Sequence, residues 1–385
     1  MYPPGGLQVT WDEGTGDWTM CGLVGKVFGV SVCLSPAAKD QCKDKLSPPS
    51  SPMSLCDHVA HVLAQLLDND ADGKADDERL TKFMVANNYY LVVPSSEKDF
   101  EAWTSGAVPP PGTPQMTGLF EAYPGSCDTP INRGASNTDR ATWVAAVDNT
   151  PGKTSCDPRR DATTEEVLHL MTAAAGAIWP ETWGPQFAST AGGAVAATNG
   201  NCGWGFAGNY KNPRGSSPAC SGQYAYDDST CDEGCIVVEG VYWASVAWMG
   251  GLMTNDRASS VAQEWQMTVP DATMASALPS GQANAKTLEE GAKSLFNLVS
   301  DTTSDGHKWL PKIMPDGNYI VGSGPAPAPA PAPGPAPGPA PSGPTPPSGG
   351  EKKKEPKKED SSARSFARRL SAGAAAAVAL VLALF

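Results

Sequence analysis

All ten cysteines of this 385-residue chain lie within its first 235 residues, and their even number strongly limits how the chain can fold. They are widely spaced and no pair forms a C-x-x-C motif, which argues against a zinc knuckle or a thioredoxin-type redox site. We therefore predict five disulfides formed in an oxidising compartment. The sequence leaves the pairing open, although Cys231 with Cys235 and Cys202 with Cys220 are the local choices.

A run of proline, alanine and glycine over residues 324–350 divides the chain. Its alternating Pro-Ala and Pro-Gly favours polyproline II and cannot form a hydrophobic core. At about 3.1 Å per residue this run extends to roughly 80 Å. We predict a globular body over residues 1–323 and a stalk over 324–350 that holds the body away from a surface. A passive linker is the alternative.

The residues after the stalk resemble a glycosylphosphatidylinositol attachment signal. Within the charged spacer 351–371, Ser361-Ser362-Ala363 supplies three small residues, and the tail 372–385 is apolar. Such a signal needs small residues, a polar spacer of about 8–12 residues and an apolar end of about 10–20. We predict Ser361 as the lipidated residue and the extracellular side of the plasma membrane as the location.

A membrane-spanning tail anchor is the other hypothesis for the C-terminus. The apolar tail is shorter than the roughly 20 residues that a spanning helix needs. In this alternative Arg364, Arg368 and Arg369 stay on the cytoplasmic side. Residues 1–6 contain neither the basic start nor the apolar run of a secretory signal. Since a lipid anchor requires the secretory pathway, we expect the true start to lie upstream.

The charge of the chain argues against a nucleic-acid function. Of its 28 basic and 41 acidic residues, eight and four lie in 351–369, which leaves 20 and 37 in the residues before 351. Phosphate neutralisation needs a basic surface, and this body is strongly acidic. We expect partners at the membrane and an extracellular protein or glycan ligand, and no nucleic acid.

Apolar residues recur at helical spacing in four segments of the body, 56–67, 164–178, 235–253 and 286–299. Residues 11–56 alternate short apolar stretches with loops and favour strand or irregular structure, and Gly- and Cys-rich loops fill 180–234. The expected fold class is α+β: a mainly helical, disulfide-rich extracellular domain with long loops, rather than a doubly wound sheet.

The segment after the first predicted helix has the pattern of a calcium loop. Acidic oxygens stand at loop positions 1, 3, 5 and 9, with Gly73 at position 6; they belong to Asp68, Asp70, Asp72 and Asp76. Calcium takes six to eight hard oxygen ligands. Position 12 is Arg79, so Asp77 or Glu78 would have to complete the shell, as in extracellular calcium loops that share the D-x-D-x-D-G core and that this segment resembles. The alternative is a solvated acidic turn.

A second candidate site combines Glu165, Glu166 and His169 with a distant glutamate. On a helix, residues three and four apart share a face, which is ligand spacing for zinc. Glu239 is the one charged residue between Cys235 and Met249, and a buried carboxylate needs a cation or a dense hydrogen-bond shell. We predict His169, Glu166 and Glu239 as zinc ligands. The alternative is that Thr163-x-x-Glu166 is a capping box.

This set loosely resembles zincin-type metallopeptidases, in which helices deliver His and Glu ligands and a further Glu activates the water. The diagnostic H-E-x-x-H is absent, so the resemblance assigns the general-base role to Glu165. It implies a zinc-dependent, peptidase-like hydrolase. His58 and His61, three apart on the first helix, are further candidate ligands, although such pairs more often face solvent. The competing hypothesis is a noncatalytic, calcium-stabilised adhesion or cell-wall-associated protein.

Overall fold

The computed structural model describes residues 6–42, 54–106, 110–117, 163–213, 220–252, 264–267, 282–315 and 317–322. All of them belong to one compact unit that contains Met1–Ala326. The predicted stalk, the charged spacer with Ser361, the apolar tail, and Cys127 and Cys156 fall outside the described residues. Within these ranges no helix is long and apolar enough to cross a membrane.

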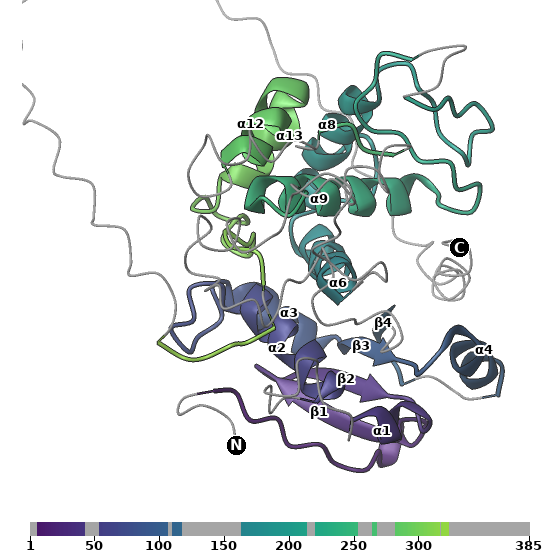
Figure 1. Ribbon diagram of the computed structural model, residues 1–385, viewed down its shortest axis with the longest axis vertical. Helices are drawn as coiled ribbons and strands as arrows, with labels where there is room; N and C mark the ends of the chain where they lie inside the picture. The colour runs from purple at the N-terminus through teal and green to yellow at the C-terminus, as the bar shows by residue number, and fades with distance from the viewer. Residues whose placement is uncertain are drawn as a thin grey trace, which may run out of the picture. The chain divides into compact units, whose positions relative to one another are not determined.

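A four-stranded mixed sheet forms one side of the body, in the order β1 (Leu23–Val27), β2 (Val30–Leu34), β3 (Tyr89–Val93) and β4 (Thr113–Met116). Strands β1 and β2 form an antiparallel hairpin, and β2, β3 and β4 pair in parallel (Figure 1). The hairpin turn is Phe28-Gly29, both with positive φ, 49° and 87°. Two left-handed residues are what a two-residue turn between twisted strands requires.

Helices connect the parallel strands and cover the sheet. The crossover from β2 to β3 contains α1 (Ala38–Gln41), α2 (Leu55–Leu67) and α3 (Glu78–Ala86), and α4 (Glu97–Gly106) connects β3 to β4. One face of the sheet packs on α2, α3 and α6 (Thr163–Ile178). On the other face Trp103 of α4 packs with Tyr90 and the Cys21–Cys33 disulfide. Strand β3 is apolar along its length because both faces are covered.

Helix α6 lies at the centre of the body and joins the sheet to a second group of helices. It contacts α2, α3, β3 and β4 on one side, and α7 (Pro180–Trp183) and α9 (Glu233–Met249) on the other (Figure 1). Helices α8 (Thr190–Asn199), α12 (Gln282–Gly291) and α13 (Lys293–Ser300) pack around α9. Being surrounded, α6 and α9 bury nearly every face, so polar side chains on them are held inside the protein.

The body is a mixed α/β fold, and most predicted elements are confirmed. The four helical segments correspond to α2, α6, α9 and the pair α12–α13. The last segment is divided because Ala292 leaves the helical region, at φ −148° and ψ 68°. Helix α8 lies in a region predicted as loop; its Ala- and Gly-rich sequence has no apolar stripe. The sequence interpretation also did not include β3 and β4.

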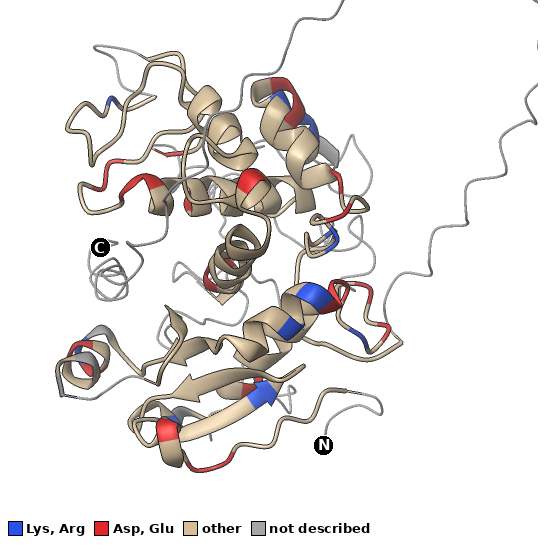
Figure 2. Ribbon diagram, turned by 180° about the vertical axis from the view of Figure 1, so that it is seen from behind, with Lys and Arg blue, Asp and Glu red and all other residues tan. Residues whose placement is uncertain are grey.

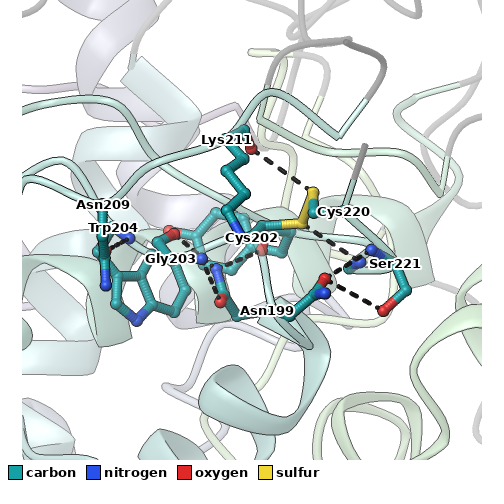
Figure 3. The surroundings of a disulfide bond; sticks show 11 residues. Asn199, Cys202, Gly203, Trp204, Asn209, Lys211, Cys220 and Ser221 are labelled. Atoms are coloured by element: carbon teal, nitrogen blue, oxygen red, sulfur yellow. Dashed lines mark hydrogen bonds between the residues drawn. A yellow bond between two sulfur atoms is a disulfide. The ribbon is translucent and has the colours of Figure 1, made fainter. Parts of the chain in front are cut away.

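Four disulfides lie within the described residues, and both predicted local pairs are confirmed. The bonds are Cys21–Cys33, Cys42–Cys56, Cys202–Cys220 and Cys231–Cys235. Around Cys202–Cys220, the Asn199 side chain donates to the Gly203 carbonyl and accepts from its N–H, both at 2.9 Å (Figure 3). The bridge and this amide together fix the loop between α8 and α9, where helical hydrogen bonds are absent.

Candidate metal centres

The first candidate centre lies between α6 and α9. One ligand atom from each of Glu165, His169 and Glu239 lies within 4.8 Å of the others. Glu165 and His169 are four residues apart on α6 and therefore share a face, and α9 brings Glu239 against that face. The three side chains are 2%, 5% and 5% exposed. Figure 2 shows acidic residues on the two central helices as well as on outer loops and helices.

The two ring nitrogens of His169 have different surroundings. Nδ1 lies 3.3 Å from Oε2 of Glu166, and the same oxygen accepts a hydrogen bond from Nε2 of Gln115 on β4. A carboxylate acceptor at Nδ1 keeps the proton of the neutral ring on that nitrogen. The lone pair of Nε2 then points away from Glu166, toward Glu239. Such a carboxylate behind a histidine is the usual support of a metal-ligating imidazole.

The contact between Nε2 of His169 and Glu239 has the spacing of two ligands of one ion. The nitrogen lies 3.3 Å from Oε2 of Glu239, within ion-pair distance but outside the geometry of a regular hydrogen bond. In a tetrahedral zinc site with bonds of 2.0–2.1 Å, neighbouring ligand atoms are separated by about 3.4 Å. Among the described residues His169 is the one charged partner of Glu239. The donor set of one imidazole and two carboxylates fits zinc.

The pKa of His169 reflects the surplus of negative charge at this centre. Burial alone lowers it, but the negative charges of Glu239 and Glu166 and the polar contacts of the ring with both carboxylates outweigh burial and raise the pKa to about 10. Without a metal, His169 is thus an imidazolium between two carboxylates. A cation that binds Nε2 must displace this proton, because only the neutral ring is a ligand.

The structure distributes the predicted zinc residues differently from the sequence hypothesis. It brings Glu165 together with His169 and Glu239, and it places Glu166 behind His169. The Glu166 carboxylate is directed to the side chains of Gln115 and His169, which accounts for its burial without the capping box. Sequence reasoning missed Gln115, because it lies in a short strand 51 residues before Glu166 and no local pattern connects the two.

Aromatic side chains surround the buried centre. The Tyr242 ring packs edge-on against His169, with centroids 5.6 Å apart. Burial and the nearby charge of Glu239 raise the pKa of both Tyr224 and Tyr226 far above the ordinary value, so both stay neutral phenols. These aromatic rings leave little water at the centre. Electrostatic interactions there are therefore screened less and are stronger.

The second candidate centre is the loop between α2 and α3. Carboxylate oxygens of Asp68, Asp70 and Asp76 lie within 4.8 Å of one another, and Asp72 is not part of this group. Asp68 accepts hydrogen bonds from the N–H groups of Gly73, at 2.8 Å, and Asp72, at 3.1 Å. Gly73 has φ 91°, which lets the chain turn back and bring the acidic side chains together. An all-oxygen set of this kind suits calcium.

The residues predicted to complete the calcium shell are engaged elsewhere. The Asp77 side chain caps α3 by accepting from the N–H groups of Arg79 and Leu80 at 3.0 and 3.1 Å. Glu78 is exposed and paired with Lys82 at 2.6 Å. The Arg79 guanidinium, at loop position 12, lies over the Trp179 ring. Three carboxylates therefore converge without the bidentate glutamate of an EF-hand.

Crowding of carboxylates changes their acidity. Burial, with smaller contributions from Asp70 and Asp68, raises the pKa of Asp76 to about 6. Burial also raises the pKa of Asp68, against the hydrogen bonds that it accepts from Tyr319 and Gly73. A divalent cation would remove this cost by supplying the missing positive charge.

The candidate ligands His58 and His61 belong to α2, and His61 serves a different purpose. Its Nδ1 accepts from the Tyr319 N–H at 3.0 Å, and its Nε2 lies 3.1 Å from the Leu7 carbonyl. Both nitrogens are thus used by backbone groups, so His61 is not available to a metal with His169. Burial lowers the pKa of His61 to about 4. His58 is fully buried on the same helix.

His61 begins a row of polar side chains at four-residue steps, two on α2 and the third, Asn69, in the loop after it. Gln65 accepts from the Gly317 N–H at 2.8 Å. Asn69 accepts from the N–H groups of Lys312 and Ile313 at 2.7 and 3.0 Å and donates to the Ile313 carbonyl. Tyr319 also donates to Asp68. The row holds Lys312, Ile313, Gly317 and Tyr319 against α2 and the acidic loop.

No protein-family model, no curated protein and no solved structure matches this chain.

Proposed function

We propose that this protein is a cell-surface ectodomain with a zinc-dependent, peptidase-like hydrolase centre formed by Glu165, His169 and Glu239. The observation that carries the proposal is the convergence of one ligand atom each from Glu165, His169 and Glu239 within 4.8 Å, with His169 Nε2 only 3.3 Å from Glu239. Zinc held there would lower the pKa of a bound water and polarise a substrate carbonyl.

The proposal reassigns the roles of the two adjacent glutamates. Glu165 becomes a ligand, because it shares a helix face with His169 and lies with it in the ligand group. Glu166 fixes the ring of His169 by accepting at Nδ1, and Gln115 holds Glu166 in turn. The three ligands come from two packed helices, so their separation is set by the interior of the protein.

A structural calcium ion in the Asp68, Asp70 and Asp76 loop completes the proposed body. Supporting it are the convergence of the three carboxylates and the raised pKa of Asp76, which a cation would relieve. The ion would hold α2 to α3 and, through Asp68, segment 312–319. Its role would be structural, since it would stabilise the packing of these segments on one another.

We further propose that residues 324–350 form a stalk and that a lipid joined at Ser361 retains the protein on the extracellular side of the plasma membrane. The disulfides support passage through an oxidising compartment. A phospholipase specific for the lipid anchor should release the protein from intact cells. Retention after treatment, together with release by deletion of 372–385, would instead support a spanning tail.

The noncatalytic surface protein is the second candidate, and one observation favours it. His169 lies between Glu166 and Glu239, 3.3 Å from each, so a protonated ring can satisfy both carboxylates without any ion. In that case the centre is a buried ion-pair triad that stabilises the packing of α6 on α9. In this alternative calcium and the disulfides stabilise the body, and no zinc is bound.

Elemental analysis of the purified full chain tests the two candidates. The hydrolase proposal expects about one zinc per chain, lost in His169→Ala, and cleavage of an unstructured protein such as casein. Glu165→Gln should lose zinc, whereas Glu166→Gln should keep zinc with affinity reduced about 10–100-fold. Glu165→Gln with full zinc content and no activity would return Glu165 to the general-base role. Calcium alone in the wild type would overturn the zinc proposal.

A further inference from the structure

A groove separate from both metal centres lies at the β1 edge of the sheet, where the N-terminal segment pairs with β1. It has a volume of about 390 Å³, within the range of ligand sites. Residues of the N-terminal segment, of the short helix η1 (Gly16–Trp18) and of β1 line it. Its lining includes the side chains of Gln8, Thr10, Asp12, Glu13, Trp18 and Lys26.

Trp18 is the one large aromatic residue of the groove, and it is held rigidly. Its ring meets Tyr90 edge-on at a centroid distance of 5.0 Å. Tyr90 is fully buried, and its hydroxyl donates to the Pro110 carbonyl at 2.9 Å. The Cys21–Cys33 disulfide packs in the same cluster. Trp18 is half-buried, so it offers the groove an aromatic surface whose ordering requires no further loss of entropy.

Two opposite charges line the groove without neutralising each other. Within the described ranges, the side chains of Asp12 and Lys26 have neither a hydrogen-bond nor an ion-pair partner. The backbone of Asp12 is fixed, because its N–H and carbonyl pair with Val24 of β1 at 3.0 and 2.7 Å. Glu13, by contrast, is paired with Lys39. The groove therefore offers one carboxylate and one ammonium group that no other described side chain engages.

This combination indicates the chemistry of the ligand. A sugar hydroxyl both donates to a carboxylate and accepts from an ammonium group. The C–H groups on one face of a pyranose ring form an apolar patch that packs on an aromatic ring, and the indole of Trp18 supplies such a ring. Gln8 and Thr10 add neutral donors and acceptors. Two carboxylates disfavour a phosphate or a polyanion, because like charges repel.

We propose that this groove binds a neutral oligosaccharide, with Trp18 as the stacking surface and with Asp12 and Lys26 as hydrogen-bonding groups. The inference is independent of zinc, since neither Glu165, His169 nor Glu239 lines the groove. It gives the body a glycan-binding surface on the strand farthest from β4 in the sheet order.

Saturation-transfer NMR on the full chain tests the proposal with three probes: cellohexaose, maltohexaose and β-1,4-mannohexaose. Saturation should reach the ring C–H protons of at least one probe at millimolar concentration. Asp12→Asn and Lys26→Met should each weaken that binding at least about tenfold, since each removes a charged hydrogen-bonding group. Trp18→Phe, which keeps an aromatic ring against Tyr90, should weaken it a few-fold.

Matched controls keep the test independent of folding. Asp17→Asn and Lys82→Met change exposed residues outside the groove and should bind the sugar as the wild type does. No transfer to any of the three probes overturns the proposal. Wild-type binding in Asp12→Asn and Lys26→Met overturns it as well, and so does binding of a polar hexapeptide in place of the sugars.

Discussion

The two candidate metal centres are alike in size and opposite in construction. In each, three ligand atoms lie within 4.8 Å of one another. The loop centre takes Asp68, Asp70 and Asp76 from nine consecutive residues, whereas the α6–α9 centre unites residues 74 positions apart, from Glu165 to Glu239. A tight turn brings the first set together, and the packing of two buried helices brings the second together. One centre is local and the other depends on the whole core.

The two centres also differ in their ligand atoms. The loop offers oxygens alone, which hard calcium prefers, and the helices offer an imidazole with two carboxylates, which suits zinc. The loop ligands Asp70 and Asp76 are half-exposed, while all three helix ligands are buried. Damage to the helix centre should therefore affect the fold more than damage to the loop.

The largest expected effect comes from removing the imidazole of the buried centre. His169→Ala leaves the carboxylates of Glu166 and Glu239 buried without their cationic partner. Breaking a buried pair in this way costs about 3–5 kcal/mol of the free energy of unfolding. Urea denaturation of the full chain measures this cost. A loss below about 1 kcal/mol would show that the contacts of His169 with Glu166 and Glu239 contribute little to the stability of the fold.

Acid should weaken the polar row on α2 without involving either metal centre. The pKa of His61 is about 4 in the folded protein, below its ordinary 6.5. Between these values the unfolded chain binds a proton that the folded protein excludes. The contribution of His61 is thus complete above about pH 6.5 and falls as the pH drops toward 4, by up to about 3 kcal/mol.

Unfolding free energies of the wild type and of His61→Gln, measured from pH 7 to pH 4, isolate this effect. The difference between their slopes in that window belongs to His61, because other groups titrate in both proteins. Equal slopes would mean that the ring does not hold Leu7 and Tyr319 in the neutral form.

Calcium should stabilise the protein through the loop alone. At a concentration 100 times its Kd, an ion bound only to the folded state adds about 2.7 kcal/mol. We expect a calcium-dependent increase in Tm that chelation reverses. Asp70→Asn should abolish the increase, and His169→Ala should retain it. Loss of the increase in both variants would mean that the two centres are coupled and that calcium does not act through the loop alone.

Gln115 tests how far the buried centre extends beyond its ligands. Gln115→Met keeps the length of the side chain and removes its hydrogen bond to Glu166. Zinc affinity should fall about tenfold, the lower end for a supporting partner of a ligand. Competition with a metal indicator measures it, and Gln8→Met, on the exposed N-terminal segment, is the control. Unchanged affinity would remove Gln115 from the centre.

The smallest expected effect distinguishes a helix cap from a ligand. Asp77→Ala should cost about 1 kcal/mol, as the loss of an N-cap does. Its calcium affinity should equal that of the wild type, because Asp77 is directed to the N–H groups of α3. A large fall in calcium affinity would make Asp77 a ligand, as the sequence first suggested.

Elements of the fold could be predicted from the sequence where residues close together in the chain determine the local structure. The apolar spacing of α2 and α6, the acidic loop, and the pairs Cys231–Cys235 and Cys202–Cys220 are all readable from short segments. Strand β3 was missed although it was equally readable, since Tyr89–Val93 is an uninterrupted apolar run between Asn88 and Pro94. Helix α8 was not readable, because burial on several sides removes the polar face that would give it a period.

The sequence by itself determined which residues are available: the cysteines, the acidic loop, and a histidine with glutamates at helical spacing. Only the tertiary structure decided that Glu165 rather than Glu166 joins His169 and Glu239, that Gln115 supports Glu166, and that His61 binds backbone. The physical reason is that helical spacing puts both glutamates near His169, and the sequence does not say from which side β4 and α9 approach.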